Sequence, residues 1–174
     1  MVQLLHNADA TDEPPVESSE VDLIHRVARE MRLMSSFSAL FSHAVAERVG
    51  MPNTDIETMD LLNVLGPMTA GQLAQMTGLS TGATTRLIDR LEHAGLVRRR
   101  HDAADRRRVF IEPVYENLSE IGALFTPLAA KLGELWSTFS DADLDTVLRF
   151  TVQTRAAIAA ENARLRGQAA DTPG

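Results

Sequence analysis

Hydrophobic and polar residues alternate along most of this chain with the period of an α-helix. Apolar residues recur every three to four positions, which places them on one face of a helix. The pattern predicts helices over about residues 19–48, 54–65, 69–77, 80–94, 115–138 and 140–166. Two short runs, 96–100 and 109–111, read as strands instead. The sequence therefore predicts a mainly α chain with one small β-hairpin.

Capping signals in the middle of the chain predict a helix, a turn and a second helix. Thr69 and Gln72 form a T-x-x-Q capping box, which starts the first helix. Gly78 ends it, because glycine adopts a left-handed conformation at little cost. Leu79 is expected to be buried in the turn, and Ser80 is the next N-cap. The inward face of the second helix is expected to consist of Thr84, Leu87, Ile88 and Leu91.

The opposite face of that second helix carries small polar groups and arginine. Thr81, Gly82, Thr85 and Arg86 lie on it, and Arg90 lies at its edge. Such a face suits the major groove of DNA, where base edges present donors and acceptors. An ordinary amphipathic helix with a solvated polar face would look the same. The helix by itself leaves both interpretations open.

The predicted hairpin adds positive charge directly after this helix pair. Its connecting segment, residues 101–108, ends in Arg106, Arg107 and Arg108. Such a tip can enter a minor groove or lie on phosphates. A solvated charge run is the alternative, but the arginines follow a helix-turn-helix pattern at the distance of a wing. Their position therefore favours a nucleic-acid contact.

These motifs together resemble the MarR family of bacterial transcriptional regulators. The matching pattern is G-L-S-x-G-A-x-T-R-L-I-D-R-L-E-x-x-G-L-V-R-R followed by D-x-x-D-R-R-R-V, and the close match covers about residues 54–112. The resemblance implies a winged helix-turn-helix plus N- and C-terminal dimerisation helices. It also implies a homodimer that binds a pseudo-palindromic operator in double-stranded DNA and acts as a repressor. A winged-helix adaptor that binds other proteins without reading DNA is the alternative.

The resemblance also assigns candidate site residues. Asp105 is expected to orient Arg107, the wing arginine of the family, and an effector pocket for a small aromatic or anionic molecule is implied at Phe37, Phe41, Met59 and Asn63. Core packing explains the same four residues, and regulation by protein concentration alone stays open. The residues expected to bind DNA are Ser80, Thr81, Gly82, Thr85, Arg86, Arg90, Arg106, Arg107 and Arg108.

The distribution of charge agrees with DNA binding although the net charge is −7. Residues 81–108 hold eight arginines and four acidic residues, a local balance of +4. The rest of the chain therefore carries −11. A basic surface on an acidic body orients a protein on a polyanion and limits indiscriminate binding.

Composition excludes several other classes of protein. The chain has 174 residues and no cysteine, so disulfides, thiolate metal sites and thiol-based sensing are excluded. Its histidines lack partners at ligand spacing, and we expect no metal and no cofactor. No hydrolase or phosphate-binding motif is present, so we expect no enzyme. Neither a membrane span nor a secretion signal is evident, and we expect a cytoplasmic protein.

The terminal helices carry more apolar surface than one subunit is expected to bury, which predicts an interface. We infer a homodimer through them; a monomeric helical bundle is the alternative.

Pro127 is expected to kink or divide the helix over 115–138. Ser140 and Asp143 are expected to start the last helix. The apolar stripe of the first helix consists of Ile24, Val27, Met31, Met34, Phe37, Phe41 and Val45.

The expected domain organisation follows from these elements. It comprises a disordered leader (1–18), an N-terminal dimerisation helix (19–50), a winged helix-turn-helix domain (51–113), C-terminal dimerisation helices (114–166) and a flexible tail (167–174). Within the third segment, Thr54 and Glu57 are expected to form a second capping box, and Pro113 is expected to end the strand pairing of the hairpin.

Overall fold

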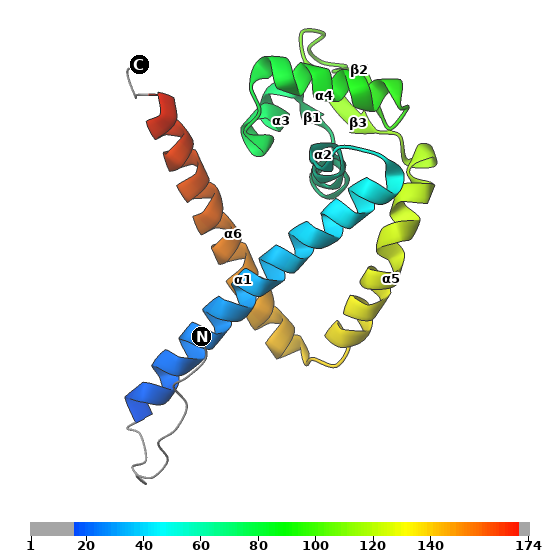
Figure 1. Cartoon of the computed structure of the whole chain (residues 1–174). Helices are drawn as coiled ribbons and strands as arrows, with labels where there is room; N and C mark the ends of the chain where they lie inside the picture. Colours follow the sequence, from blue (N-terminus) through cyan, green and yellow to red (C-terminus); the bar gives the residue numbers. More distant parts are fainter. Residues whose placement is uncertain (1–15, 171–174) are drawn as a thin grey trace, which may run out of the picture. The chain divides into compact units, whose positions relative to one another are not determined.

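A computed structural model describes residues 16–170, and helices dominate it (Figure 1). The described residues up to Ala44 form one compact unit, and those from Val45 form another. No helix in this part of the chain is long and apolar enough to cross a membrane. The elements are α1 (Val16–Val49), α2 (Asn53–Leu65), β1 (Met68–Thr69), α3 (Ala70–Thr77), α4 (Thr81–His93), β2 (Val97–His101), β3 (Val109–Pro113), the 3₁₀ turn η1 (Tyr115–Asn117), α5 (Ser119–Trp136) and α6 (Asp141–Ala170).

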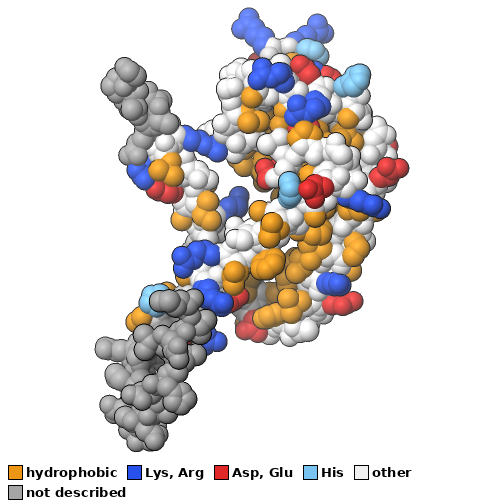
Figure 2. Space-filling view, viewed as in Figure 1, with side chains coloured by type: hydrophobic (Ala, Val, Ile, Leu, Met, Phe, Trp, Pro, Cys, Tyr) orange, Lys and Arg blue, Asp and Glu red, His pale blue; other side chains and the backbone are white. Residues whose placement is uncertain are grey.

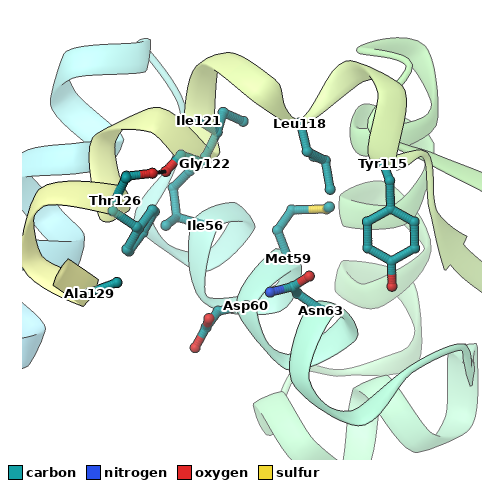
Figure 3. A pocket seen from close by; sticks show the side chains of 11 residues that line it. Ile56, Met59, Asp60, Asn63, Tyr115, Leu118, Ile121, Gly122, Thr126 and Ala129 are labelled. Atoms are coloured by element: carbon teal, nitrogen blue, oxygen red, sulfur yellow. Dashed lines mark hydrogen bonds between the residues drawn. The ribbon is translucent and has the colours of Figure 1, made fainter. Parts of the chain in front are cut away.

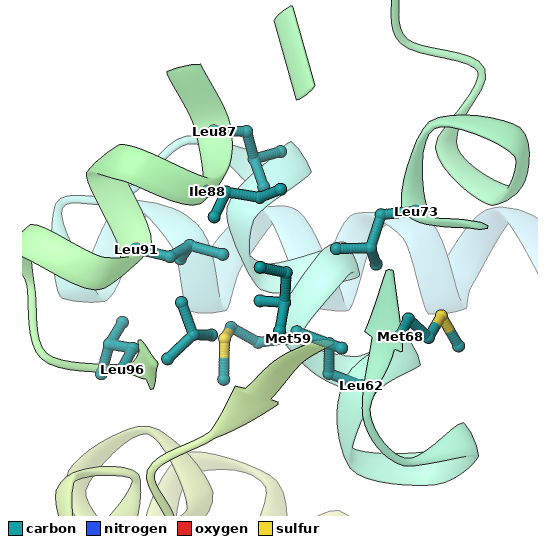
Figure 4. Packing of buried hydrophobic residues seen from close by; sticks show 10 residues of the cluster. Met59, Leu62, Met68, Leu73, Leu87, Ile88, Leu91 and Leu96 are labelled. Atoms are coloured by element: carbon teal, nitrogen blue, oxygen red, sulfur yellow. The ribbon is translucent and has the colours of Figure 1, made fainter. Parts of the chain in front are cut away.

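The second unit has a hydrophobic core built by α2, α3, α4 and the sheet (Figure 4). Leu87 and Leu91 of α4 converge with Leu73 of α3 on Met59 and Leu62 of α2. The four residues expected on the inward face of α4 are all buried, as the helical spacing predicted. Burial of each such side chain contributes about 1.5–3 kcal/mol relative to exposure. This core fixes α4 with its opposite face toward solvent.

The sheet has three strands, where the sequence analysis predicted a hairpin of two. β1 pairs with β3, which also pairs with β2, and all pairs are antiparallel. Met68 lies opposite Ile111, and Thr69 lies opposite Phe110. The sequence analysis missed β1 because a strand of two residues has no alternation to detect. The hairpin itself is confirmed, and β3 ends at Pro113 as expected, since proline has no N–H to donate.

Local capping was predicted well around the helix pair. Thr69 and Gln72 form the reciprocal capping box at the start of α3. Gly78 closes α3 with φ of 75°, a left-handed conformation. The Ser80 side chain accepts a hydrogen bond from the N–H of Ala83 and so caps α4. These groups satisfy backbone donors and acceptors that a helix end leaves unpaired, and they define the turn between α3 and α4.

The expected capping box at Thr54 and Glu57 is not formed. α2 begins one residue earlier, at Asn53, and its N-cap Pro52 offers no side-chain hydrogen bond. Asn53 donates through Nδ2 to Glu57 Oε1 at 2.7 Å instead. Thr54 thus lies inside the first turn, where its hydroxyl donates to the Asp55 carboxylate at 3.4 Å.

Two apolar residues near the ends of α2 and α3 are exposed. Leu65 and Met76 lie in the last turns of α2 and α3, where the chain leaves the core, and each is 47% exposed. Leu79, expected to be buried in the turn, is only half-buried and packs against the core. Helical spacing located the correct face but not the point at which each helix leaves the core.

The C-terminal helices differ from expectation mainly at their ends. The predicted helix over 115–138 is divided into η1 and α5 near Leu118, and α5 continues across Pro127. The hydrogen bonds between Ser140 and Asp143 confirm the cap of α6.

The ends of the described chain are also more helical than predicted. α6 runs to Ala170 and so includes part of the predicted tail. α1 begins at Val16, inside the predicted leader. Residues 1–15 and 171–174 lie outside the described residues.

Candidate nucleic-acid interface

The exposed face of α4 presents the groups that the sequence analysis assigned to DNA. Ser80, Thr81, Gly82, Thr85 and Arg86 are all exposed. The hydroxyl of Thr85 donates to the carbonyl of Thr81 at 3.0 Å, which leaves its oxygen able to accept. Apart from the helix's own backbone, a Cβ atom added at Gly82 would have only Arg86 Nη1 within 4 Å, at 3.8 Å. The start of α4 is therefore a thin surface that another molecule can approach closely.

The loop between β2 and β3, called the wing loop below, is shaped by two aspartates. Asp102 Oδ1 accepts hydrogen bonds from the N–H of Ala104 at 2.7 Å and of Asp105 at 3.3 Å. These N–H groups lower the pKa of the Asp102 carboxyl. Asp105 Oδ1 accepts from the backbone N–H of Arg107 at 3.0 Å. The contact of Asp105 with Arg107 therefore runs through the backbone and not through the guanidinium.

Two arginines of β2 are engaged by one acid of β3. Arg98 Nε lies 2.6 Å from Glu112 Oε1, and Arg100 Nε lies 2.5 Å from Glu112 Oε2. Hydrogen bonds from Arg100 and then Arg98 hold the pKa of the buried Glu112 below its ordinary value. A carboxylate shared by two guanidiniums is well compensated. The pair therefore stabilises the hairpin.

The third arginine of β2 is tied to α4. Arg99 Nη2 donates to Asp89 Oδ1 at 2.6 Å, and Nη1 donates to Glu92. The hydrogen bond to Asp89 is the main cause that raises the pKa of Arg99. The first strand of the wing is thus joined to the helix beside it.

Arg90, at the edge of the α4 face, is held by α2. Its Nε lies 2.7 Å from Asp55 Oδ2, and its Nη2 lies 2.5 Å from Asp55 Oδ1. This hydrogen bonding raises the pKa of Arg90. The Arg90 side chain is 47% exposed, whereas that of Asp55 is 1% exposed. Arg90 is therefore ion-paired with Asp55, while about half of its side chain still faces solvent.

Three arginines in this region have guanidiniums that contact no acid of the described chain: Arg86, Arg106 and Arg107. Arg108 lies 3.9 Å from Asp102, and its guanidinium is 5.1 Å from the centre of the Phe110 ring. Figure 2 shows arginine side chains projecting from the end of the unit that carries α4 and the wing loop. Unpaired guanidiniums keep their donors for phosphate or base acceptors. The arrangement can therefore bind a polyanion along α4 and the wing loop.

A pocket of about 350 Å³ lies between α2 and the segment formed by η1 and α5 (Figure 3). Met59 and Asn63, two of the four residues expected to bind an effector, line it. Phe37 and Phe41 belong to the other compact unit. The remaining lining residues are Ile56, Asp60, Tyr115, Leu118, Ile121, Gly122, Phe125, Thr126 and Ala129. Among the described residues, no cluster of acids and histidines could hold a metal ion.

The ion pairs around the interface were not foreseen from the sequence. Asp55 and Arg90 are 35 positions apart, and the Arg98 pair with Glu112 spans 14 positions. The only available signal was the placement of an acid, Glu112, inside an otherwise apolar strand. A buried acid in such a place requires a cationic partner.

Comparison with known proteins agrees with this geometry. The MarR family profile matches residues 51–109. YcgE of Bacillus subtilis (strain 168), an uncharacterised HTH-type transcriptional regulator, is 39% identical over 133 residues, which make up 76% of this chain and 86% of that protein. A solved MepR mutant from multidrug resistant S. aureus has a TM-score of 0.62 at 17% identity and covers 76% of this chain and 96% of its own. A MarR family protein from Bacillus stearothermophilus has a TM-score of 0.54 at 21% identity, with coverage of 77% and 96%.

Proposed function

Because this chain belongs to the MarR family of transcriptional regulators, we propose that it binds a specific pseudo-palindromic duplex as a homodimer and acts as a repressor. The observation that carries the proposal is the exposed polar face of α4 beside the unpaired Arg86, Arg106 and Arg107. DNA binding and regulation of transcription belong to the family, whose members are not enzymes. A bound dimer covers the duplex, which would obstruct transcription from it.

The contacts divide into base readout and phosphate positioning. Arg86 lies on the exposed face of α4, and no acid of the described chain occupies its guanidinium. It therefore suits a bidentate contact to guanine. Ser80, Thr81 and Thr85 suit phosphate or thymine. Arg107 reaches a groove from the wing loop, and Arg106 and Arg108 meet phosphates.

Exposed apolar side chains on the terminal helices support the dimer. On α1, Ile24 is 62% exposed and Phe37 is 67% exposed, and on α6, Leu148 is 61% exposed. A second subunit that covers these residues removes them from water, at a gain of about 25 cal/mol for each Å² buried. We therefore propose that α1 and α6 contribute to the interface; the sequence analysis expected both C-terminal helices to take part. Two α4 helices would then meet half-sites about one helical turn apart.

The pocket between α2 and α5 supports a small-molecule effector. Its volume lies at the small end of the range for ligand sites, and its lining is mostly apolar with a few polar groups, which is typical of such sites. The described lining includes the carboxylate of Asp60 and no Lys or Arg. We therefore favour an uncharged or cationic aromatic effector over an anionic one. An effector acts only if it binds two arrangements of the α4 helices unequally.

Selection of duplexes from a random pool tests the function. We expect enrichment of one pseudo-palindrome, and no enrichment would support the adaptor instead.

The oligomeric state of the Leu148→Glu variant in solution tests the dimer, because a charge buried at the interface should release monomers. Glu57→Arg, which reverses an exposed charge on α2 outside the proposed interface, serves as the control and should remain dimeric. A monomeric wild-type protein would contradict the proposal.

A further inference from the structure

Asp55 is a buried acid next to the DNA-binding face but not on it. It lies in the first turn of α2, where the helix dipole favours a negative charge. Its carboxylate accepts two hydrogen bonds from Arg90 and one from the hydroxyl of Thr54. Both oxygens are therefore used, and solvent does not reach them. A buried charge held in this way is fixed in position.

The fork of Arg90 is only half used by this pair. Nε and Nη2 face Asp55, while Nη1 makes no hydrogen bond within the described chain. Arg86 lies one turn earlier on α4, on the face proposed to enter the groove. The third nitrogen of Arg90 is thus presented at the edge of that face, where a groove is bordered by phosphates.

We propose that Asp55 is a positioning residue for DNA binding, which holds Arg90 so that Nη1 meets one backbone phosphate beside α4. The inference rests on the proposed function. Without Asp55, the long Arg90 side chain would sample many rotamers and lose entropy on binding. With Asp55, the guanidinium is already ordered before DNA binds, so the contact with the phosphate costs less side-chain entropy.

The chemistry of the pair explains why both residue types are needed. A carboxylate offers two oxygens in the plane of the guanidinium, and an amide offers one. Lysine keeps the positive charge, but its ammonium lacks the rigid planar set of donors with which a guanidinium can bind an acid and a phosphate at the same time. Loss of Arg90 alone would leave a buried carboxylate without compensation, which destabilises the fold. A test must therefore separate binding from stability.

The experiment measures affinity for the selected duplex against salt, together with thermal unfolding, for Asp55→Asn, Arg90→Lys, Arg90→Gln and the double variant Asp55→Asn with Arg90→Gln. We expect Asp55→Asn and Arg90→Lys each to weaken binding by the folded protein about tenfold, the scale of one charge-assisted contact. Arg90→Gln should also lower the salt slope by about one. In the Arg90→Gln background, Asp55→Asn should cost nothing further. Glu57→Gln, on the same helix as Asp55, changes an exposed acid that accepts a hydrogen bond from Asn53; it is the matched control and should leave affinity unchanged.

A fifth variant keeps the test informative if a single substitution prevents folding. Asp55→Leu with Arg90→Met replaces the ion pair by apolar side chains, which proteins often tolerate; it should fold and still bind weakly. Wild-type affinity in this variant or in Arg90→Lys would overturn the inference, as would additive losses from Asp55→Asn and Arg90→Gln. Lower melting temperatures with unchanged affinity would overturn it too. A wild-type protein that binds no duplex would instead refute the proposed function, and the role of Asp55 with it.

Discussion

Asp89 on α4 and Arg99 on β2 form an ion pair in which Nη2 of Arg99 lies 2.6 Å from Oδ1 of Asp89. Glu92 on the same helix face accepts from the same guanidinium. Arg99 is therefore a link between the helix and the wing, and its charge is already balanced. The arginines of this region differ in availability, which the sequence does not reveal, and this difference leads to the first prediction.

Arginines without an acidic partner should contribute to the salt dependence of DNA binding, and Arg98, whose guanidinium is held by Glu112, should contribute much less. Arg107→Ala should weaken binding to all duplexes and lower the salt slope by about one, because one phosphate contact is lost. Arg98→Ala is the matched control, since Glu112 keeps Arg100 as its partner, and its slope should change by much less. Titrations over a range of salt concentrations measure both. Equal changes in the two variants would contradict the division.

Arg86 should read one base position. Arg86→Ala should relax selectivity there by about 1–3 kcal/mol, because a bidentate arginine distinguishes guanine from the other bases. Competition among duplexes that differ at single positions measures this loss. Equal weakening on every duplex would make Arg86 a phosphate contact.

Glu112 should make the free energy of unfolding depend on pH in the acidic range. Its pKa is lowered in the folded protein by Arg100 and Arg98. Its contribution is therefore fully present above the unfolded pKa of about 4.3 and is lost as pH falls through the lower folded pKa. Glu112→Gln should reduce the free energy of unfolding at neutral pH by about 1 kcal/mol. Urea unfolding across pH should show the difference shrinking in acid, and a constant difference would argue against this role.

Gly122 offers a way to fill the pocket between α2 and α5. A Cβ added there meets no heavy atom within 4 Å, and the same is true of Gly133 on the same helix but outside the pocket. Gly122→Leu should abolish the thermal shift that an effector gives the wild-type protein. Gly133→Leu should keep that shift, since both changes favour the helix alike. A shift that survives in Gly122→Leu would place the effector elsewhere.

The sequence was sufficient for those parts of the fold that local rules determine. The inward face of α4, the Thr69 capping box and the left-handed Gly78 each depend on residues a few positions apart. The strand β1 was missed because Met68 and Thr69 pair with residues more than forty positions away. The predicted capping box of Thr54 and Glu57 was wrong because α2 begins one residue earlier, at Asn53, whose side chain donates to Glu57.

For the interface, the sequence predicted the surface but not its internal pairing. The basic residues of 81–108 were recognisable as a group, since their charge is written in the sequence. That Arg90 faces Asp55, or that Arg98 and Arg100 share Glu112, depends on the packing of separate elements. Residue types alone therefore overstated how many arginines are available to DNA.

The central claim is that two copies of this chain read one duplex. The most direct measurement is the affinity of the purified protein for the selected duplex and for a shuffled duplex of equal composition at physiological salt, with the stoichiometry of the complex. We predict two chains per duplex and a preference on the order of a thousandfold or more. Equal affinities for the two duplexes, or one chain bound per site, would contradict it.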